Sequence, residues 1–241
     1  MELYYDLHIH SCLSPCGDND MTPANIAGMA HIKGLQIIAL TDHNSCRNVP
    51  SLMKAAEPYE ITVVPGMELT TAEEIHVLCL FPEVEAALAF DDYVYAHLQK
   101  VENRKEIFGE QLLMDEDESV LGEEPHLLIN ATDISFDDVY DLLTPYEGLM
   151  IPAHIDKNTD SVLSALGVIP PTSQFQVAEM KNPARCAALL EAHPYLRSCR
   201  IITDSDAHTL GDIAEPERTL TFAHPHPTAK EVLEVLRNET A

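Results

Sequence analysis

The sequence predicts an α/β fold in which parallel βα units curl into a barrel, within a single domain over residues 1–241. Short apolar runs rich in Val, Ile and Leu alternate with helix-type patterns, which is typical of parallel βα units. Histidines and carboxylates also stand at the ends of several apolar runs, where parallel α/β folds place their sites. The length of 241 residues suits one such barrel.

The first part of the chain contains the clearest elements. Thr22 and Pro23 predict the start of a helix over 23–32, because Pro is favoured in the first turn, and Gly34 predicts its end. A second helix is expected over 84–105. The strands expected in this part are 3–9, 36–41, 61–65 and 75–80.

The middle of the chain interrupts the alternation. Residues 106–133 have no clear period and contain the acidic run 114–118, so we expect an insertion or flap there. Beyond it, the patterns predict helices over 135–144 and 227–237. The later strands are expected at 149–154, 175–179, 200–204 and 219–222, which gives about seven in the barrel.

Composition limits the partners. Forty acidic residues against 14 basic ones give a formal charge of −26, a field that repels nucleic-acid phosphates, so no long nucleic acid is expected. No apolar stretch approaches the roughly 18–20 residues of a membrane span, and the N-terminus does not resemble a signal peptide. We therefore expect a cytoplasmic protein without a membrane partner; the sequence contains no signal for its oligomeric state.

A set of histidines and carboxylates predicts a metal centre. His8 and His10 lie two residues apart on an expected strand, so their side chains point to the same side. Imidazoles mixed with carboxylates suit Zn, Mn or Fe, and two or three divalent ions are expected. All members except His76 end or follow an apolar run: His8, His10, His43, Glu68, His154, Asp206 and His208.

This set favours hydrolysis of a small phosphate ester. Glu68 can bridge two ions, and a water held between ions becomes a hydroxide near neutral pH that can attack phosphorus. Glu68, Asp206 and His208 are the expected catalytic residues. The chain has no glycine-rich phosphate loop and no nucleophile elbow. The candidate phosphate-binding residues are the basic ones just beyond the clusters: Arg47, Lys157, Lys181 and Arg185.

Five segments, in order, resemble the motifs of the PHP (polymerase and histidinol phosphatase) superfamily. They are Asp6–Ser11, Leu40–Asn44, Gly66–Glu68, Pro152–His154 and Ser205–His208. The resemblance implies a distorted (βα)₇ TIM-like barrel with a trinuclear metal centre at the C-terminal ends of the strands. It also implies phosphoesterase activity.

The resemblance further implies three sets of ligands. One ion would take His8, His10, Glu68 and Asp206, and a second would take Glu68, His76 and His154. A third would take His43, His208 and one ligand from the loop after His10. This chain departs from the family in that loop, where Ser14–Asp20 replaces the usual residues. We expect Asp18 to be the ligand, with Cys16 and Asp20 as alternatives.

Two other functions remain open from the sequence. One is a nuclease-type phosphodiesterase, which the charge of −26 disfavours. The other is a non-catalytic module that binds metal or senses redox state through Cys12, Cys16 and Cys46, which flank the expected metal-site loops.

Overall fold

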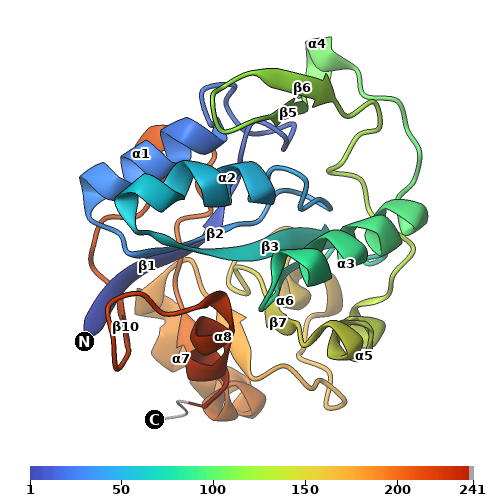
Figure 1. The fold of residues 1–241 in the computed structure, drawn as a ribbon. Helices are drawn as coiled ribbons and strands as arrows, with labels where there is room; N and C mark the ends of the chain where they lie inside the picture. The colour runs from blue at the N-terminus through green and yellow to red at the C-terminus, as the bar shows by residue number, and fades with distance from the viewer. Residues whose placement is uncertain (239–241) are drawn as a thin grey trace.

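The computed structural model describes residues 1–238 and contains a curled sheet that forms a half-barrel (Figure 1). The six strands of this sheet lie in the order β10–β1–β2–β3–β4–β7. Their bounds are Thr219–Thr221, Glu2–Ile9, Ile37–Leu40, Thr62–Thr70, His76–Leu80 and Leu149–Pro152. A separate parallel pair, β8 (Val177–Glu179) and β9 (Arg200–Ile202), continues the curl. The fold is α/β and consistent with a distorted TIM-like barrel.

The strands are not all parallel, which differs from the expectation. β2 runs parallel to β1 and β3, but β4 runs antiparallel to both β3 and β7, and β10 runs antiparallel to β1. The segment 71–75 between β3 and β4 is too short for the crossover that a parallel pair needs, so the two strands form a hairpin. Thr70, at the end of β3, therefore pairs with His76, at the start of β4.

The part of the chain that the structure describes contains a helix in each of the four predicted ranges and four further short α-helices that the patterns did not predict. At the start of α1 (Pro23–Lys33), the Thr22 side chain accepts a hydrogen bond from Asn25 N, and Gly34 ends the helix with φ 75°. The prediction of a helix to residue 105 is wrong, because Leu98 is extended (φ −71°, ψ 137°) and α3 (Val84–His97) ends before it. The α-helices are α1 Pro23–Lys33, α2 Val49–Ala56, α3 Val84–His97, α4 Lys105–Phe108, α5 Val139–Leu143, α6 Val162–Leu166, α7 Cys186–Ala192 and α8 Ala229–Asn238. Short 3₁₀ helices are η1 Glu57–Tyr59, η2 Phe136–Asp138, η3 Thr144–Tyr146, η4 Pro183–Arg185, η5 Pro194–Ser198 and η6 Leu210–Asp212.

The segment expected to be an insertion contains α4 and an antiparallel hairpin. The hairpin joins β5 (Leu112–Met114) and β6 (Val120–Glu123), and each strand is too short to give a periodic signal. Leu112 N donates to Cys12 O in the loop after β1, and Ser51 Oγ in α2 donates to Met114 O. The hairpin is thus fastened beside that loop (Figure 1).

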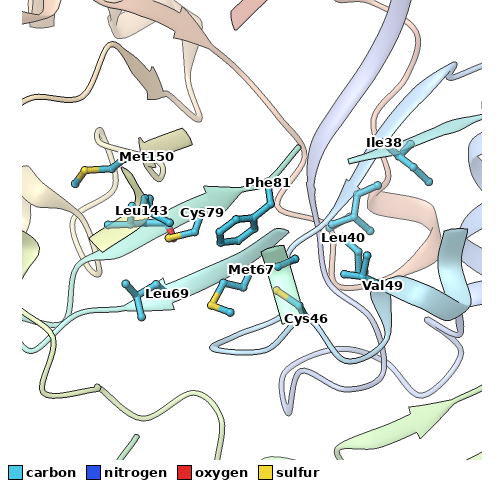
Figure 2. Close-up of a cluster of buried hydrophobic side chains, with 14 of the residues drawn as sticks. Ile38, Leu40, Cys46, Val49, Met67, Leu69, Cys79, Phe81, Leu143 and Met150 are labelled. Carbon is cyan, nitrogen blue, oxygen red and sulfur yellow. The ribbon is translucent and has the colours of Figure 1, made fainter. Parts of the chain in front are cut away.

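Alternation along the strands separates two apolar clusters. Ile38 and Leu40 face helices α1 and α2 in one cluster, which also includes Met67, Cys79 and Phe81 (Figure 2). Ile37 and Ala39 point to the opposite side, into a cluster with the inner-face residues of the other strands. Helix α8 supplies Val232, Leu233 and Leu236 to this second cluster. Within residues 1–238, no helix is long and apolar enough to cross a membrane.

Candidate metal centre

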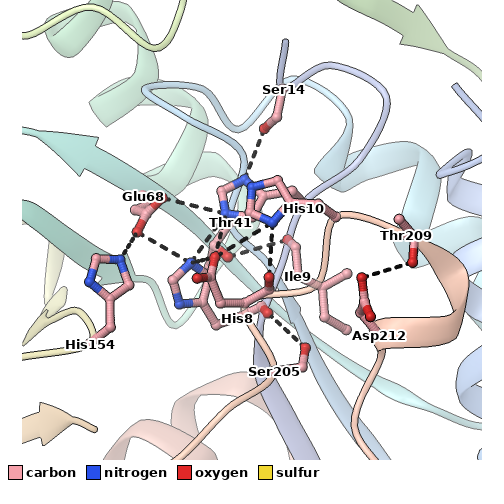
Figure 3. Close-up of polar contacts among 12 residues, drawn as sticks. His8, Ile9, His10, Ser14, Thr41, Glu68, His154, Ser205, Thr209 and Asp212 are labelled. Carbon is pink, nitrogen blue, oxygen red and sulfur yellow. Dashed lines mark hydrogen bonds and ion pairs between the residues drawn. The ribbon is translucent and has the colours of Figure 1, made fainter. Parts of the chain in front are cut away.

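Glu68, on β3, is surrounded by histidines. Its carboxylate is almost completely buried, and Figure 3 shows His8, His10 and His154 directed toward it. Five imidazole nitrogens lie within 3.4 Å of its oxygens: His8 Nε2 (3.3 Å), His10 Nε2 (3.4 Å), His43 Nδ1 (3.1 Å), His76 Nδ1 (3.0 Å) and His154 Nε2 (3.1 Å).

The topology of the strands explains this convergence. His10 follows the end of β1, and His154 follows the end of β7. His43 follows β2 and forms a parallel bridge with Glu68. His76 was the exception in the sequence, because it stands at the start of its strand. Since β4 is antiparallel to β3, its start lies at the same edge as the ends of the parallel strands. His76 therefore reaches the same carboxylate.

The loop after β9 adds Asp206 and His208. Asp206 Oδ1 lies 3.5 Å from His8 Nε2 and 3.6 Å from His10 Nε2. The rings of His208 and His10 stack with a centroid distance of 4.3 Å. Asp206 has a positive φ of 53° and His154 one of 31°, conformations that non-glycine residues seldom adopt and that often occur at functional sites.

Three groups of side chains present ligand atoms within 4.8 Å of one another: His8–His10–Glu68, His43–Glu68–His76 and His10–His43–His208. The chemistry of this donor set fits divalent metal ions, because one carboxylate cannot accept a hydrogen bond of good geometry from every imidazole around it. The buried His43 Nδ1 indeed makes no hydrogen bond. The three groups contain six of the nine predicted ligands. His154 lies against Glu68 and Asp206 against His8, so the structure brings eight of the nine together.

The charges of the two carboxylates depend on these imidazoles. Burial raises the pKa of Glu68, but His76 and His8 outweigh it and hold that pKa well below its usual value. Burial likewise opposes ionisation of Asp206, and the hydrogen bond from His10 with the charge of His8 lowers its pKa. Both groups are therefore anionic at neutral pH, as metal ligands must be.

The histidines differ among themselves. Burial lowers the pKa of His8, but the charges of Glu179 and Glu68 raise it well above its usual value. Burial and the charge of His10 lower the pKa of His208 to about 4. Burial also holds the pKa of His43 well below its usual value, although Glu68 opposes the shift. His43 and His208 are thus neutral at pH 7 and offer lone pairs to a metal.

A residue that the sequence interpretation missed lies behind His8. Glu179 Oε1 lies 2.9 Å from His8 Nδ1, and Glu179 Oε2 accepts a hydrogen bond from His154 N at 2.7 Å. Glu179 was read only as the end of a strand. The available signal was the same one that identified the other ligands, a carboxylate at the end of an apolar run.

The loop after β1 does not bring the carboxylate of Asp18 into any of the three groups. Asp18 Oδ1 accepts a hydrogen bond from Asp20 N, and Asp18 N donates to His208 O. Both aspartates and Cys16 are exposed. The choice among Asp18, Cys16 and Asp20 as a third-site ligand stays a prediction.

Cys12 and Cys46, the other two cysteines near these loops, are buried. Burial raises the pKa of Cys12 to about 12 and that of Cys46 well above its usual value. Their thiols are protonated at neutral pH and are weak nucleophiles. This disfavours a redox role for both.

Two of the four basic residues expected to bind substrate lie beside Asp206. Lys157 Nζ lies 3.3 Å and Lys181 Nζ 3.8 Å from Asp206 Oδ2, at the edge of the histidine cluster. Arg185 donates to Asp156 O beside a surface pocket that Lys157 also lines.

Arg47 is engaged elsewhere. Its Nε lies 3.2 Å from Asp91 Oδ2, its Nη1 bonds Glu124, and its guanidinium stands over the Tyr95 ring. A role of Arg47 or Arg185 in substrate binding stays a prediction.

Comparisons with known proteins agree with this geometry. The model of the PHP domain family matches residues 6–163. The uncharacterized protein MJ1587 of Methanocaldococcus jannaschii is 33% identical over 98 residues, 37% of this chain and 57% of that protein. A 5'-3' exoribonuclease of Haemophilus influenzae is 32% identical over 79 residues, 32% of this chain and 28% of that protein. The matches thus span less than two thirds of these relatives' own lengths.

Solved structures share the fold. The lesion-specific endonuclease PfuEndoQ from Pyrococcus furiosus is similar over 98% of this chain and 56% of its own, with a TM-score of 0.69 and 17% identity. A putative metal-dependent phosphoesterase from Bifidobacterium adolescentis is similar over 96% of this chain and 95% of its own, with a TM-score of 0.59 and 15% identity.

Proposed function

The chain belongs to the PHP domain family of metal-dependent phosphoesterases, and we propose that it hydrolyses a small phosphate monoester at the cluster around Glu68. The convergence of five imidazoles on the buried carboxylate of Glu68, with Asp206 beside two of these imidazoles, carries this proposal. Two largely buried anionic carboxylates and the neutral imidazoles of His43 and His208 form a donor set that suits divalent cations.

We assign roles to the residues from their positions. Divalent ions bound here would activate a water and polarise the phosphoryl group. Glu68, Asp206 and His208 would hold these ions beside the reacting phosphate. The neutral imidazole of His208 can bind a metal or accept a proton. Lys157 and Lys181, beside Asp206, would bind the phosphate oxygens and keep the ester in line for attack.

The charge of the chain favours a small substrate. With a net charge of −26, a long polyanion would be repelled over most of its length, whereas a monoester needs only the local cations and the metal. The likeness to a lesion-specific endonuclease and to a 5'-3' exoribonuclease supports nuclease activity as the second candidate.

A substrate panel tests both functions. We expect the protein loaded with Mn²⁺ or Zn²⁺ to release phosphate from nucleotides, nucleoside bisphosphates or sugar phosphates, and a chelator to stop the release. No metal-dependent phosphate release from any monoester would contradict the proposal. Cleavage of oligonucleotides in place of monoesters would establish the nuclease.

A further inference from the structure

Glu179 holds two candidate metal ligands at once. Its carboxylate is completely buried between the end of β8 and the histidine cluster. One oxygen lies 2.9 Å from His8 Nδ1, and the other accepts from the backbone N–H of His154 at 2.7 Å. His8 belongs to β1 and His154 follows β7, so one side chain links ligands from two separate parts of the half-barrel.

The contact with His8 selects a tautomer. A carboxylate accepts hydrogen bonds, so His8 Nδ1 carries the proton in this contact, and the lone pair of the neutral ring is on Nε2. Nε2 is the atom that faces Glu68 and Asp206. The contact thus presents the lone pair of His8 to the place where a metal would bind.

A similar contact supports His10. His10 Nδ1 lies 2.9 Å from Ser14 Oγ, and Ser14 Oγ donates to Asp42 Oδ1 at 2.7 Å. Since the serine proton is used on Asp42, the hydroxyl oxygen accepts from His10 Nδ1, and the lone pair of the neutral His10 ring is on Nε2. The two histidines therefore direct the same nitrogen to the site, but only His8 has a carboxylate directly on its Nδ1.

We propose that Glu179 is a positioning residue for the metal centre, which fixes the tautomer of His8 through one oxygen and the backbone of His154 through the other. This inference rests on the proposed function. Outer carboxylates that orient metal-binding histidines typically contribute about 10–100-fold to metal affinity or activity.

Replacing Glu179 with Gln isolates this role, because both of its partners are donors. Glutamine has one acceptor oxygen, so Glu179→Gln can accept from His8 or from His154 N but not from both. If its NH₂ group faces His8, the ring proton moves to Nε2 and blocks the metal. If the NH₂ group faces His154 N, two donors oppose each other and the turn shifts.

Asp204→Asn is a matched control. Asp204 is a buried carboxyl group after the neighbouring strand β9, and its Oδ1 accepts from Leu7 N without contacting a candidate ligand side chain. Its amide variant keeps that acceptor.

The decisive measurement is zinc affinity by competition with a chromophoric chelator, with folding monitored by circular dichroism. We expect Glu179→Gln to weaken Zn²⁺ binding about 10–100-fold and Asp204→Asn to leave it within about twofold. Equal Zn²⁺ affinity of the wild type and Glu179→Gln would overturn the inference. It would not contradict the proposed function, which the phosphoesterase assay of the wild type tests. A wild type that binds no Zn²⁺ would also overturn the inference, whereas the proposed function is tested separately by phosphate release with Mn²⁺.

A second measurement does not depend on the variant folding. In ¹H–¹⁵N NMR spectra of the zinc-loaded wild type, His8 should carry its proton on Nδ1. A proton on Nε2 would overturn the inference.

Discussion

The two sides of the half-barrel are held together differently. Strands β1, β2 and β3 form a parallel ladder of backbone hydrogen bonds, with one shift of register between Asp6 and Ile9 of β1. On the other side, β8 and β9 form a separate pair, and buried carboxylates cross the seams between this pair and the main sheet.

These seams are defined by three carboxylates. Asp204 accepts from Leu7 N, and Asp6 accepts from Ser205 N and Ala214 N across the β9–β1 seam. Glu179 crosses from β8 to His154 after β7. Of the three, only Glu179 contacts the side chain of a candidate ligand, His8. The parallel ladder thus forms the frame, whereas the seams close the half-barrel and Glu179, at one of them, supports the site.

The largest effect should come from Glu68, where ligands from both sides meet. Glu68→Gln removes the charge that faces five imidazoles, so metal binding and hydrolysis should both be lost. We expect a fall in kcat/KM greater than the roughly 100-fold upper range for an outer carboxylate. Steady-state kinetics with the best monoester measures it. A fall smaller than that of Glu179→Gln would show that Glu68 is not the centre of the site.

The second largest effect should be on the free energy of unfolding, at the seam between β9 and β1. Asp6→Ala leaves the partly buried N–H groups of Ser205 and Ala214 without acceptors, and a buried group without a partner costs about 1–3 kcal/mol. We expect the free energy of unfolding to fall by about 3 kcal/mol in urea denaturation. A loss near zero would mean that the seam closes without this carboxylate.

The parallel ladder should tolerate the loss of a side-chain hydrogen bond. Thr41 Oγ1 lies 3.3 Å from Ile9 O, but Thr41 N already donates to that carbonyl at 2.9 Å. Thr41→Val should therefore cost less than about 1 kcal/mol in the same urea experiment. A loss as large as that of Asp6→Ala would remove the distinction between ladder and seam.

The smallest effect is local and depends on pH. At the start of α8, hydrogen bonds from Thr228 and His224 lower the pKa of Glu231 to about 2. Because the folded pKa lies below the unfolded value of 4.5, the charge contributes stability above about pH 4.5 and loses it as the pH falls toward 2. Glu231→Gln should lower the melting temperature slightly at pH 7 and not at all near pH 2. A constant difference across this range would show that the charge is not responsible.

Several features were accessible from local sequence. Thr22, Pro23 and Gly34 predicted both ends of α1, since capping and left-handed glycine depend on neighbouring residues alone. The end of α3 was placed at 105 instead of His97, because the intervening residues have no strong helix breaker. The hairpin β5–β6 was missed for a similar reason, since strands of three and four residues give no usable period.

The sequence by itself determined the α/β class, most elements and the residue types of the candidate centre, because hydrophobic period and side-chain chemistry are local properties. Only the tertiary structure decided that β4 is antiparallel, which carries His76 to Glu68. It also directed Arg47 to Asp91 and Glu124, and placed Glu179 against His8. The contacts of Arg47 and Glu179 join residues 44 to 171 positions apart, and such contacts depend on how the strands are ordered and packed, which no local pattern encodes.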